Sequence, residues 1–130
     1  MKFFFFFSFF FIFLATASFG QTPTCSKFKD GKFKIAATSY SKEMYINRKG
    51  DKQKESVEGE EGFTEYIVKW IDNCTYTLTP TAKTYLKFPK LPENAVLTVK
   101  IIEVKDHSYI QTSTANFADY AATSEVIKIK

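Results

Sequence analysis

The amino-acid sequence predicts an all-β protein, an antiparallel meander of about eight strands that closes into an up-and-down, lipocalin-like barrel or a partly open barrel. Short segments of alternating apolar and polar residues recur along the chain, and turns that contain glycine, asparagine or aspartate separate them. No segment after the first twenty residues has the period of a long helix. The alternative is a two-sheet immunoglobulin-like sandwich, but Trp70 stands only four residues before Cys74, too close for that fold.

The first twenty residues predict a secretory signal peptide. Lys2 precedes a compact, phenylalanine-rich apolar run, and Ser18 and Gly20 supply the small side chains that a signal peptidase requires. We expect cleavage after Gly20, which leaves one domain over residues 21–130. The alternative is an uncleaved membrane anchor, although only Lys2 flanks the run. The protein is therefore expected to be exported to the periplasm or the cell exterior, with no membrane span after cleavage.

The charge of the domain is mild. The formal net charge of +4 falls to +3 when Lys2 leaves with the signal peptide. The remaining lysines are spread over alternate strand positions, as on a solvated sheet face. We therefore expect no nucleic-acid partner.

The first half of the domain is expected to hold three strands. The alternation of Phe33 and Ile35 with lysines predicts a strand within residues 28–38. Residues 44–48 predict a second strand, and the turn signal after it predicts a hairpin that returns over residues 53–57. The glycine-punctuated acidic segment 58–62 is expected to be a solvated turn.

A central hairpin is expected over residues 65–79, around a tight turn at Asp72 and Asn73. Both side chains tolerate positive φ and bond to their own backbone, which suits a two-residue turn. The alternating side chains of its buried face are Tyr66, Val68 and Trp70 before the turn, and Cys74, Tyr76 and Leu78 after it.

Residues 80–94 contain three prolines and predict a surface connection, with a short helical or extended piece around residues 82–88. The apolar run 96–104 predicts a sixth strand that bends at a bulge, because its apolar residues cannot all share one face otherwise. Residues 108–115 and 124–130 predict the last two strands.

Two cysteines, Cys25 and Cys74, lie in the exported part. An even number of cysteines outside the cytosol predicts one disulfide, which would tie the start of the domain to the central hairpin. The alternative is a pair of buried free thiols.

Catalytic and metal-binding residues are not expected. The sole histidine, His107, lies between Asp106 and Ser108, and side chains of adjacent residues cannot converge as a catalytic triad does. Two cysteines and one histidine at these spacings match no zinc site. We therefore expect no enzymatic activity and no cofactor.

A candidate ligand set starts from Arg48, Gln53 and Glu55, which neighbouring strands bring to one face. The forked guanidinium of Arg48 suits an acidic head group. The alternative is an exposed cross-strand ion pair between Arg48 and Glu55. Tyr66 and Trp70 complete the candidate set, with core packing as their alternative.

The framework residues also carry a resemblance. The pattern Cys25-x-x-Phe28-x-x-Gly31-x-Phe33, followed by Tyr66-x-Val68-x-Trp70-x-x-x-Cys74-x-Tyr76-x-Leu78, resembles a group of small exported proteins of the Bacteroidetes with a reduced lipocalin-like barrel. The resemblance spans nearly all of residues 25–130 and includes no active-site motif. Members of the group are sometimes called DNA topoisomerase IV, a function for which a chain of this length has no room.

The sequence is compatible with two functions. One is a non-enzymatic barrel, expected to be a monomer, that binds a small apolar or acidic-head-group ligand. The other is an interaction module that presents its sheet to another envelope protein. The interior volume distinguishes them, because small residues such as Ala37 and Thr112 would leave room for a ligand.

Overall fold

The computed structural model describes residues 24–130, which form a closed antiparallel barrel with the strands in sequence order. This confirms the predicted all-β up-and-down barrel. The expected signal peptide and its cleavage site lie outside the described residues. No helix within residues 24–130 is long and apolar enough to cross a membrane. The elements are η1 (Cys25–Phe28), β1 (Gly31–Ile35), β2 (Met44–Lys49), β3 (Lys52–Val57), β4 (Thr64–Asp72), β5 (Thr75–Pro80), α1 (Ala82–Lys87), β6 (Leu97–Val104), β7 (Ser108–Ala115) and β8 (Ala118–Lys128).

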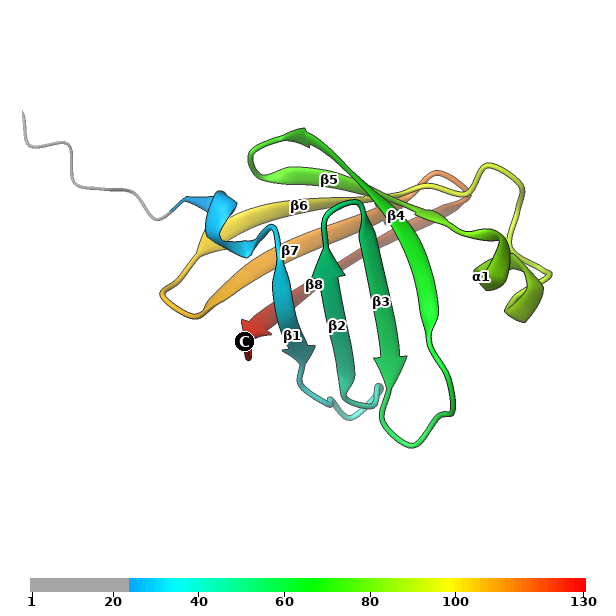
Figure 1. Ribbon diagram of the computed structural model, residues 1–130, viewed down its shortest axis with the longest axis horizontal. Helices are drawn as coiled ribbons and strands as arrows, with labels where there is room; N and C mark the ends of the chain where they lie inside the picture. The colour runs from blue at the N-terminus through cyan, green and yellow to red at the C-terminus, as the bar shows by residue number, and fades with distance from the viewer. Residues whose placement is uncertain (1–23) are drawn as a thin grey trace, which may run out of the picture.

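The barrel is flattened into two layers. In Figure 1, β1, β2 and β3 run side by side in front, and β6, β7 and β8 cross behind them. The long strand β4 bends from the front layer to pair with β5, which continues the rear layer. The predicted bulge in the sixth strand is present as a register shift between Ile101 and Glu103.

The two ends of the barrel differ. At the closed end, η1 lies beside the β2–β3, β4–β5 and β6–β7 turns, and a disulfide joins Cys25 of η1 to Cys74 of the β4–β5 turn. This confirms the predicted pairing. Phe28, Phe33 and Tyr109 are fully buried there and pack with ring centroids 5.0–6.4 Å apart. The open end is formed by the β1–β2 and β3–β4 connections, α1 and the β7–β8 turn.

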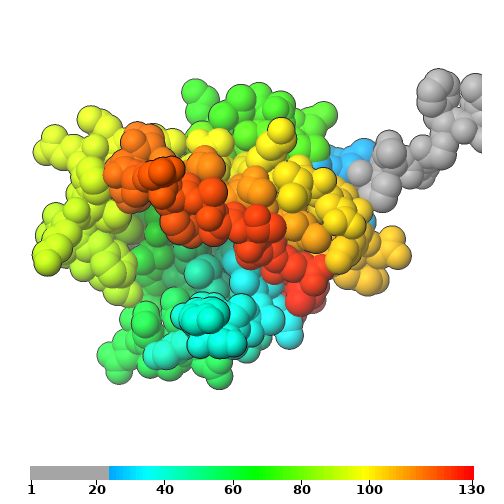
Figure 2. Space-filling model, turned by 180° about the vertical axis from the view of Figure 1, so that it is seen from behind, coloured from blue at the N-terminus to red at the C-terminus, as the bar shows by residue number. Residues whose placement is uncertain are grey.

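The seam that closes the barrel is short. β1 pairs with β8 through two residue pairs, Phe33 with Lys128 and Lys34 with Ile127, and backbone hydrogen bonds between Lys32 and residues 129 and 130 extend this pairing past the end of β8. Toward the open end, β1 stops at Ile35, so residues 118–125 of β8 pair with β7 alone. A side opening results, between residues 120–124 of β8 and the turn at residues 38–41. Figure 2 shows this face, with a hollow between the orange-red strand β8 and the cyan β1–β2 connection.

The turn of the central hairpin differs from the prediction. Its two turn residues are Asn73 and Cys74, and neither has a positive φ; within the described residues only Asn94 and four glycines do. A register shift between Trp70 and Asp72 lets the Asp72 Oδ1 accept a hydrogen bond from the Cys74 backbone N–H at 2.9 Å. The Asp72 side chain therefore stabilises this turn, and neither turn residue adopts the left-handed backbone conformation that was expected.

One strand bound was also predicted wrongly. The first strand, Gly31–Ile35, lies within the predicted residues 28–38 and follows η1, which occupies residues 25–28. The last strand begins at Ala118 rather than at residue 124. Its first residues are small or polar, and they are extended because they pair with β7.

Candidate functional site: the barrel interior

The interior of the barrel holds a cavity of about 630 Å³ that reaches the side opening. Its apolar wall comes from β1, β2, β5 and β6. On the β7 and β8 side, three of the lining residues are small, and they leave space that larger side chains would fill; Gln111 and Tyr120 also line this side. The apolar wall residues are Ile35, Met44, Ile46, Leu78, Leu97 and Val99, and the small inward residues are Ser113, Ala122 and Ser124.

Four polar side chains, Gln53, Glu55, Tyr76 and Gln111, also line this cavity, and we call them the polar floor. Gln53 and Glu55 are alternate residues of β3, so both face inward. The Gln53 Nε2 donates to the Glu55 carboxylate at 2.8 Å. On the other side, the Tyr76 hydroxyl donates to Gln111 Oε1 at 3.3 Å. The floor therefore presents a carboxylate, two amides and a phenol to the cavity.

Arg48 lies between the polar floor and the closed end, and its hydrogen bonds connect Gln53 on one side of the floor with Tyr76 on the other. Its Nε donates to Gln53 Oε1 at 2.8 Å, and its Nη2 donates to the hydroxyls of Tyr76 at 2.8 Å and Tyr109 at 3.0 Å. Its Nη1 donates to the Phe28 carbonyl at 2.7 Å, which fixes η1 against the barrel. Arg48 is 1% exposed and does not line the cavity. The alternative of an exposed ion pair with Glu55 is therefore wrong.

Glu55 carries the titratable group of the floor. The residue is only partly buried by surface area, yet desolvation by the surrounding protein raises the pKa of its carboxyl. The hydrogen bond from Gln53 and the charge of Arg48 lower this pKa but do not cancel the effect of burial. Burial likewise raises the pKa of the Tyr76 phenol, which therefore remains protonated and able to donate.

The other two predicted ligand residues lie beside and below the cavity. Tyr66 is partly buried on β4, directly across from Gln53, and desolvation followed by the Glu55 charge raises the pKa of its phenol. Trp70 packs on the Tyr76 ring with centroids 4.6 Å apart, and the Arg48 guanidinium lies 5.9 Å from its centroid. Neither residue lines the cavity. Of the five predicted residues, Gln53 and Glu55 face the cavity. Arg48 donates a hydrogen bond to Gln53 from the side away from the cavity.

Sequence reasoning missed Gln111 as part of the polar floor. The signal was present, because Tyr109, Gln111 and Ser113 alternate on one face of β7, and a glutamine between two inward positions must also face inward. The residues expected to leave a void were also misplaced. Thr112 points away from the interior, whereas Ser113 lines the cavity.

No cluster of three histidine, cysteine or carboxylate side chains able to hold a metal ion occurs within residues 24–130. His107 is exposed in the β6–β7 turn at the closed end, where its carbonyl accepts a hydrogen bond from the Lys128 backbone N–H at 2.7 Å. It does not line the cavity.

Comparison of the chain with family models, with curated proteins and with solved structures finds no match. The resemblance to small exported Bacteroidetes proteins therefore stays a prediction.

Proposed function

We propose that this protein is an exported, non-enzymatic binding protein that holds one small amphipathic molecule inside the barrel. The observation that supports this proposal is the cavity of about 630 Å³, which has an apolar wall, a polar floor and a side opening. Its volume falls in the range of about 300 to 1,000 Å³ in which protein ligand sites are found. The disulfide between Cys25 and Cys74 is consistent with an oxidising compartment such as the periplasm or the cell exterior.

The floor favours a head group that donates hydrogen bonds, such as an amine or a hydroxyl. The Glu55 carboxylate faces the cavity, whereas the Arg48 guanidinium gives its hydrogen bonds to protein acceptors on the other side of the floor. A carboxylate ligand would meet Glu55 at close range, and two like charges in a desolvated site repel each other. The acidic head group expected from the sequence is therefore the less favoured ligand class.

The test uses two environment-sensitive fluorescent probes with the same aliphatic chain, one ending in an amine and one in a carboxylic acid. We expect the amine probe to bind more tightly. Glu55→Gln should weaken amine binding by about 10- to 100-fold, the usual worth of a hydrogen bond to a charged group. It should not weaken binding of the acid probe. Tighter binding of the acid by the unaltered protein would return Arg48 to the role of anchor.

A matched pair of variants tests whether the ligand binds inside the barrel. Ser113→Trp places an indole in the cavity, whereas Thr114→Trp places it on the outer face of the same strand. Only the first should abolish probe binding. If the unaltered protein binds neither probe, and native mass spectrometry of protein from its natural source shows no bound compound, an interaction module of the cell envelope becomes the better function.

A further inference from the structure

The outer face of β1, β2 and β3 concentrates positive charge. Side chains alternate between the interior and the outside along each strand, so the outward positions can be read from the buried ones. Five of these eight positions are lysine and none is acidic. We call this surface the lysine face; its outward residues are Lys32, Lys34, Tyr45, Asn47, Lys49, Lys52, Lys54 and Ser56.

The lysine face differs in charge from the outward side of β7. The outward positions of β7, in the other layer, are Ser108, Ile110, Thr112 and Thr114. On the lysine face, Lys34 and Lys52 each lie 3.8 Å from a carboxylate, of Glu43 and Glu65. Within residues 24–130, neither Lys32 nor Lys54 forms an ion pair. Like Lys49, these two lysines therefore offer exposed ammonium groups to an anion.

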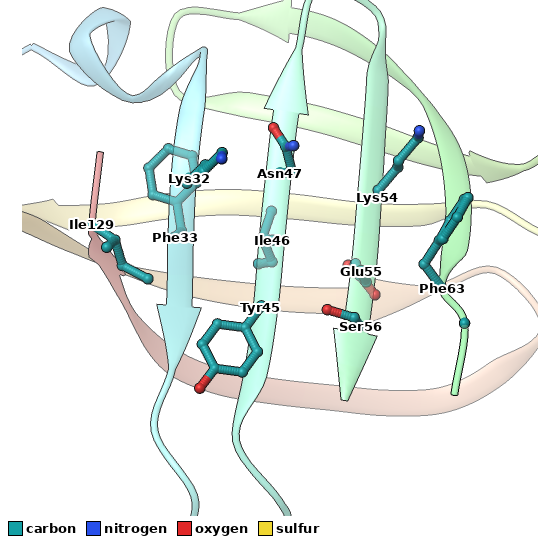
Figure 3. A pocket seen from close by; sticks show the side chains of 11 residues that line it. Lys32, Phe33, Tyr45, Ile46, Asn47, Lys54, Glu55, Ser56, Phe63 and Ile129 are labelled. Atoms are coloured by element: carbon teal, nitrogen blue, oxygen red, sulfur yellow. The ribbon is translucent and has the colours of Figure 1, made fainter. Parts of the chain in front are cut away.

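These two lysines flank a polar amide. Asn47 is the direct cross-strand partner of Lys32 on one side and of Lys54 on the other. Neighbouring strands lie about 5 Å apart, so the two lysines stem from backbone about 10 Å apart with the amide between them. Figure 3 shows the three side chains in one row across the strands. An anion over this row can meet two positive charges and an amide donor.

Below the row lies a groove of about 430 Å³ whose walls are largely apolar; Glu55 of β3 is the one acidic residue among those that line it. Tyr45 borders it on β2, and Phe63 and Ile129 stand at its two sides (Figure 3). Tyr45 is 41% exposed and Phe63 is 45% exposed, so both rings are accessible. The Lys54 Nζ lies 4.8 Å from the centroid of the Phe63 ring, which places charge next to an aromatic face.

We infer that this groove binds an acidic polysaccharide. Carboxylate or sulfate groups along such a chain would meet Lys32 and Lys54, and the remaining lysines of the face would meet further groups of the same chain. The amide of Asn47 suits sugar hydroxyls, and the rings of Tyr45 and Phe63 suit the apolar faces of sugar rings. A hollow bordered by side chains fits a narrow polymer better than it fits a flat bilayer. This site lies on the outside of the barrel, apart from the cavity of the proposed function.

The test is isothermal titration of the full domain with polygalacturonate, dextran sulfate and uncharged dextran. We expect binding of the two acidic polymers, weakened by salt, and no binding of dextran. The double variant Lys32→Gln and Lys54→Gln should bind about tenfold more weakly or worse. The matched control, Lys83→Gln and Lys100→Gln, removes the same charge from exposed positions elsewhere and should bind normally.

Tyr45→Ala leaves the charge unchanged and separates a sugar site from mere charge attraction. It should weaken polysaccharide binding several-fold at constant net charge. The inference is overturned if both double variants lose affinity equally, if Tyr45→Ala has no effect, or if phosphatidylglycerol vesicles or RNA bind more tightly than the acidic polymers. Binding by the Ser113→Trp variant should be normal, so the outcome is independent of the interior ligand.

Discussion

At the scale of single residues, Arg48 connects the closed end to the cavity. Its guanidinium bonds to one backbone carbonyl and three side chains, and it also lies 5.0 Å from the Phe33 ring centroid. Within residues 24–130, no buried side-chain polar atom lacks a partner. A buried charge is tolerated only when it is satisfied in this way.

Arg48→Met should therefore destabilise the protein by at least about 1 to 3 kcal/mol, the cost of one unsatisfied buried acceptor, because it leaves the acceptors on Phe28, Gln53 and the two tyrosines without their donor. Urea unfolding measures this loss. Lys34→Met, which removes an exposed pair, is the control and should cost about 1 kcal/mol or less. Equal effects would mean that Arg48 is solvated.

Glu55→Gln should change how stability depends on pH. The folded protein raises the pKa of this carboxyl, mainly through desolvation, so the folded state holds the proton more tightly than the unfolded state. The contribution of Glu55 to stability is therefore most favourable at low pH and declines as pH rises from the ordinary carboxyl range through the raised pKa. Glu55→Gln has no titrating group at this position, so its stability lacks this decline with pH.

Urea unfolding of both proteins between about pH 4 and pH 8 checks the sign. The stability of Glu55→Gln relative to the unaltered protein should increase with pH. Glu58→Gln, at an exposed position in the following turn, controls for the loss of one negative charge. A relative stability that falls with pH contradicts the desolvated setting of Glu55.

At the scale of elements, η1 is too short to be stable alone. It has four residues and is held by the Cys25–Cys74 disulfide, by burial of Phe28 and by the Arg48 bond to the Phe28 carbonyl. The covalent link and the hydrogen bond fix the same turn from two sides. The floor of the cavity therefore depends on a segment outside the sheet.

Replacing both cysteines by serine should reduce the free energy of unfolding by about 4 kcal/mol, the chain-entropy value for a loop of this length. Differential scanning calorimetry of the double variant measures the loss, and intact mass with and without reductant verifies the bond in the unaltered protein. If the double variant melts at the original temperature, the disulfide has no stabilising role.

At the scale of the whole molecule, the alternation of apolar and polar residues was enough to predict the barrel and the strands β2 to β7. It was not enough where pairing overrides local preference. Residues 118–122 include three alanines and an aspartate, which have little strand propensity, and this segment is extended where it pairs with β7. The sequence also predicted that Arg48 shares a face with Gln53 and Glu55, but the acceptors of its guanidinium lie 5 to 61 residues away in the chain. Only the closed barrel reveals that they converge.

The short seam also sets an order for folding. Seven of the eight strand pairings join consecutive strands, and only the pairing of β1 with β8 brings distant parts of the chain together. Loop-closure entropy makes such a contact late to form. The seam continues the edge along which the interior cavity opens. For the interior ligand that we propose, opening of the seam and exchange of the ligand would then be one motion, and the strength of the seam would govern the lifetime of the complex.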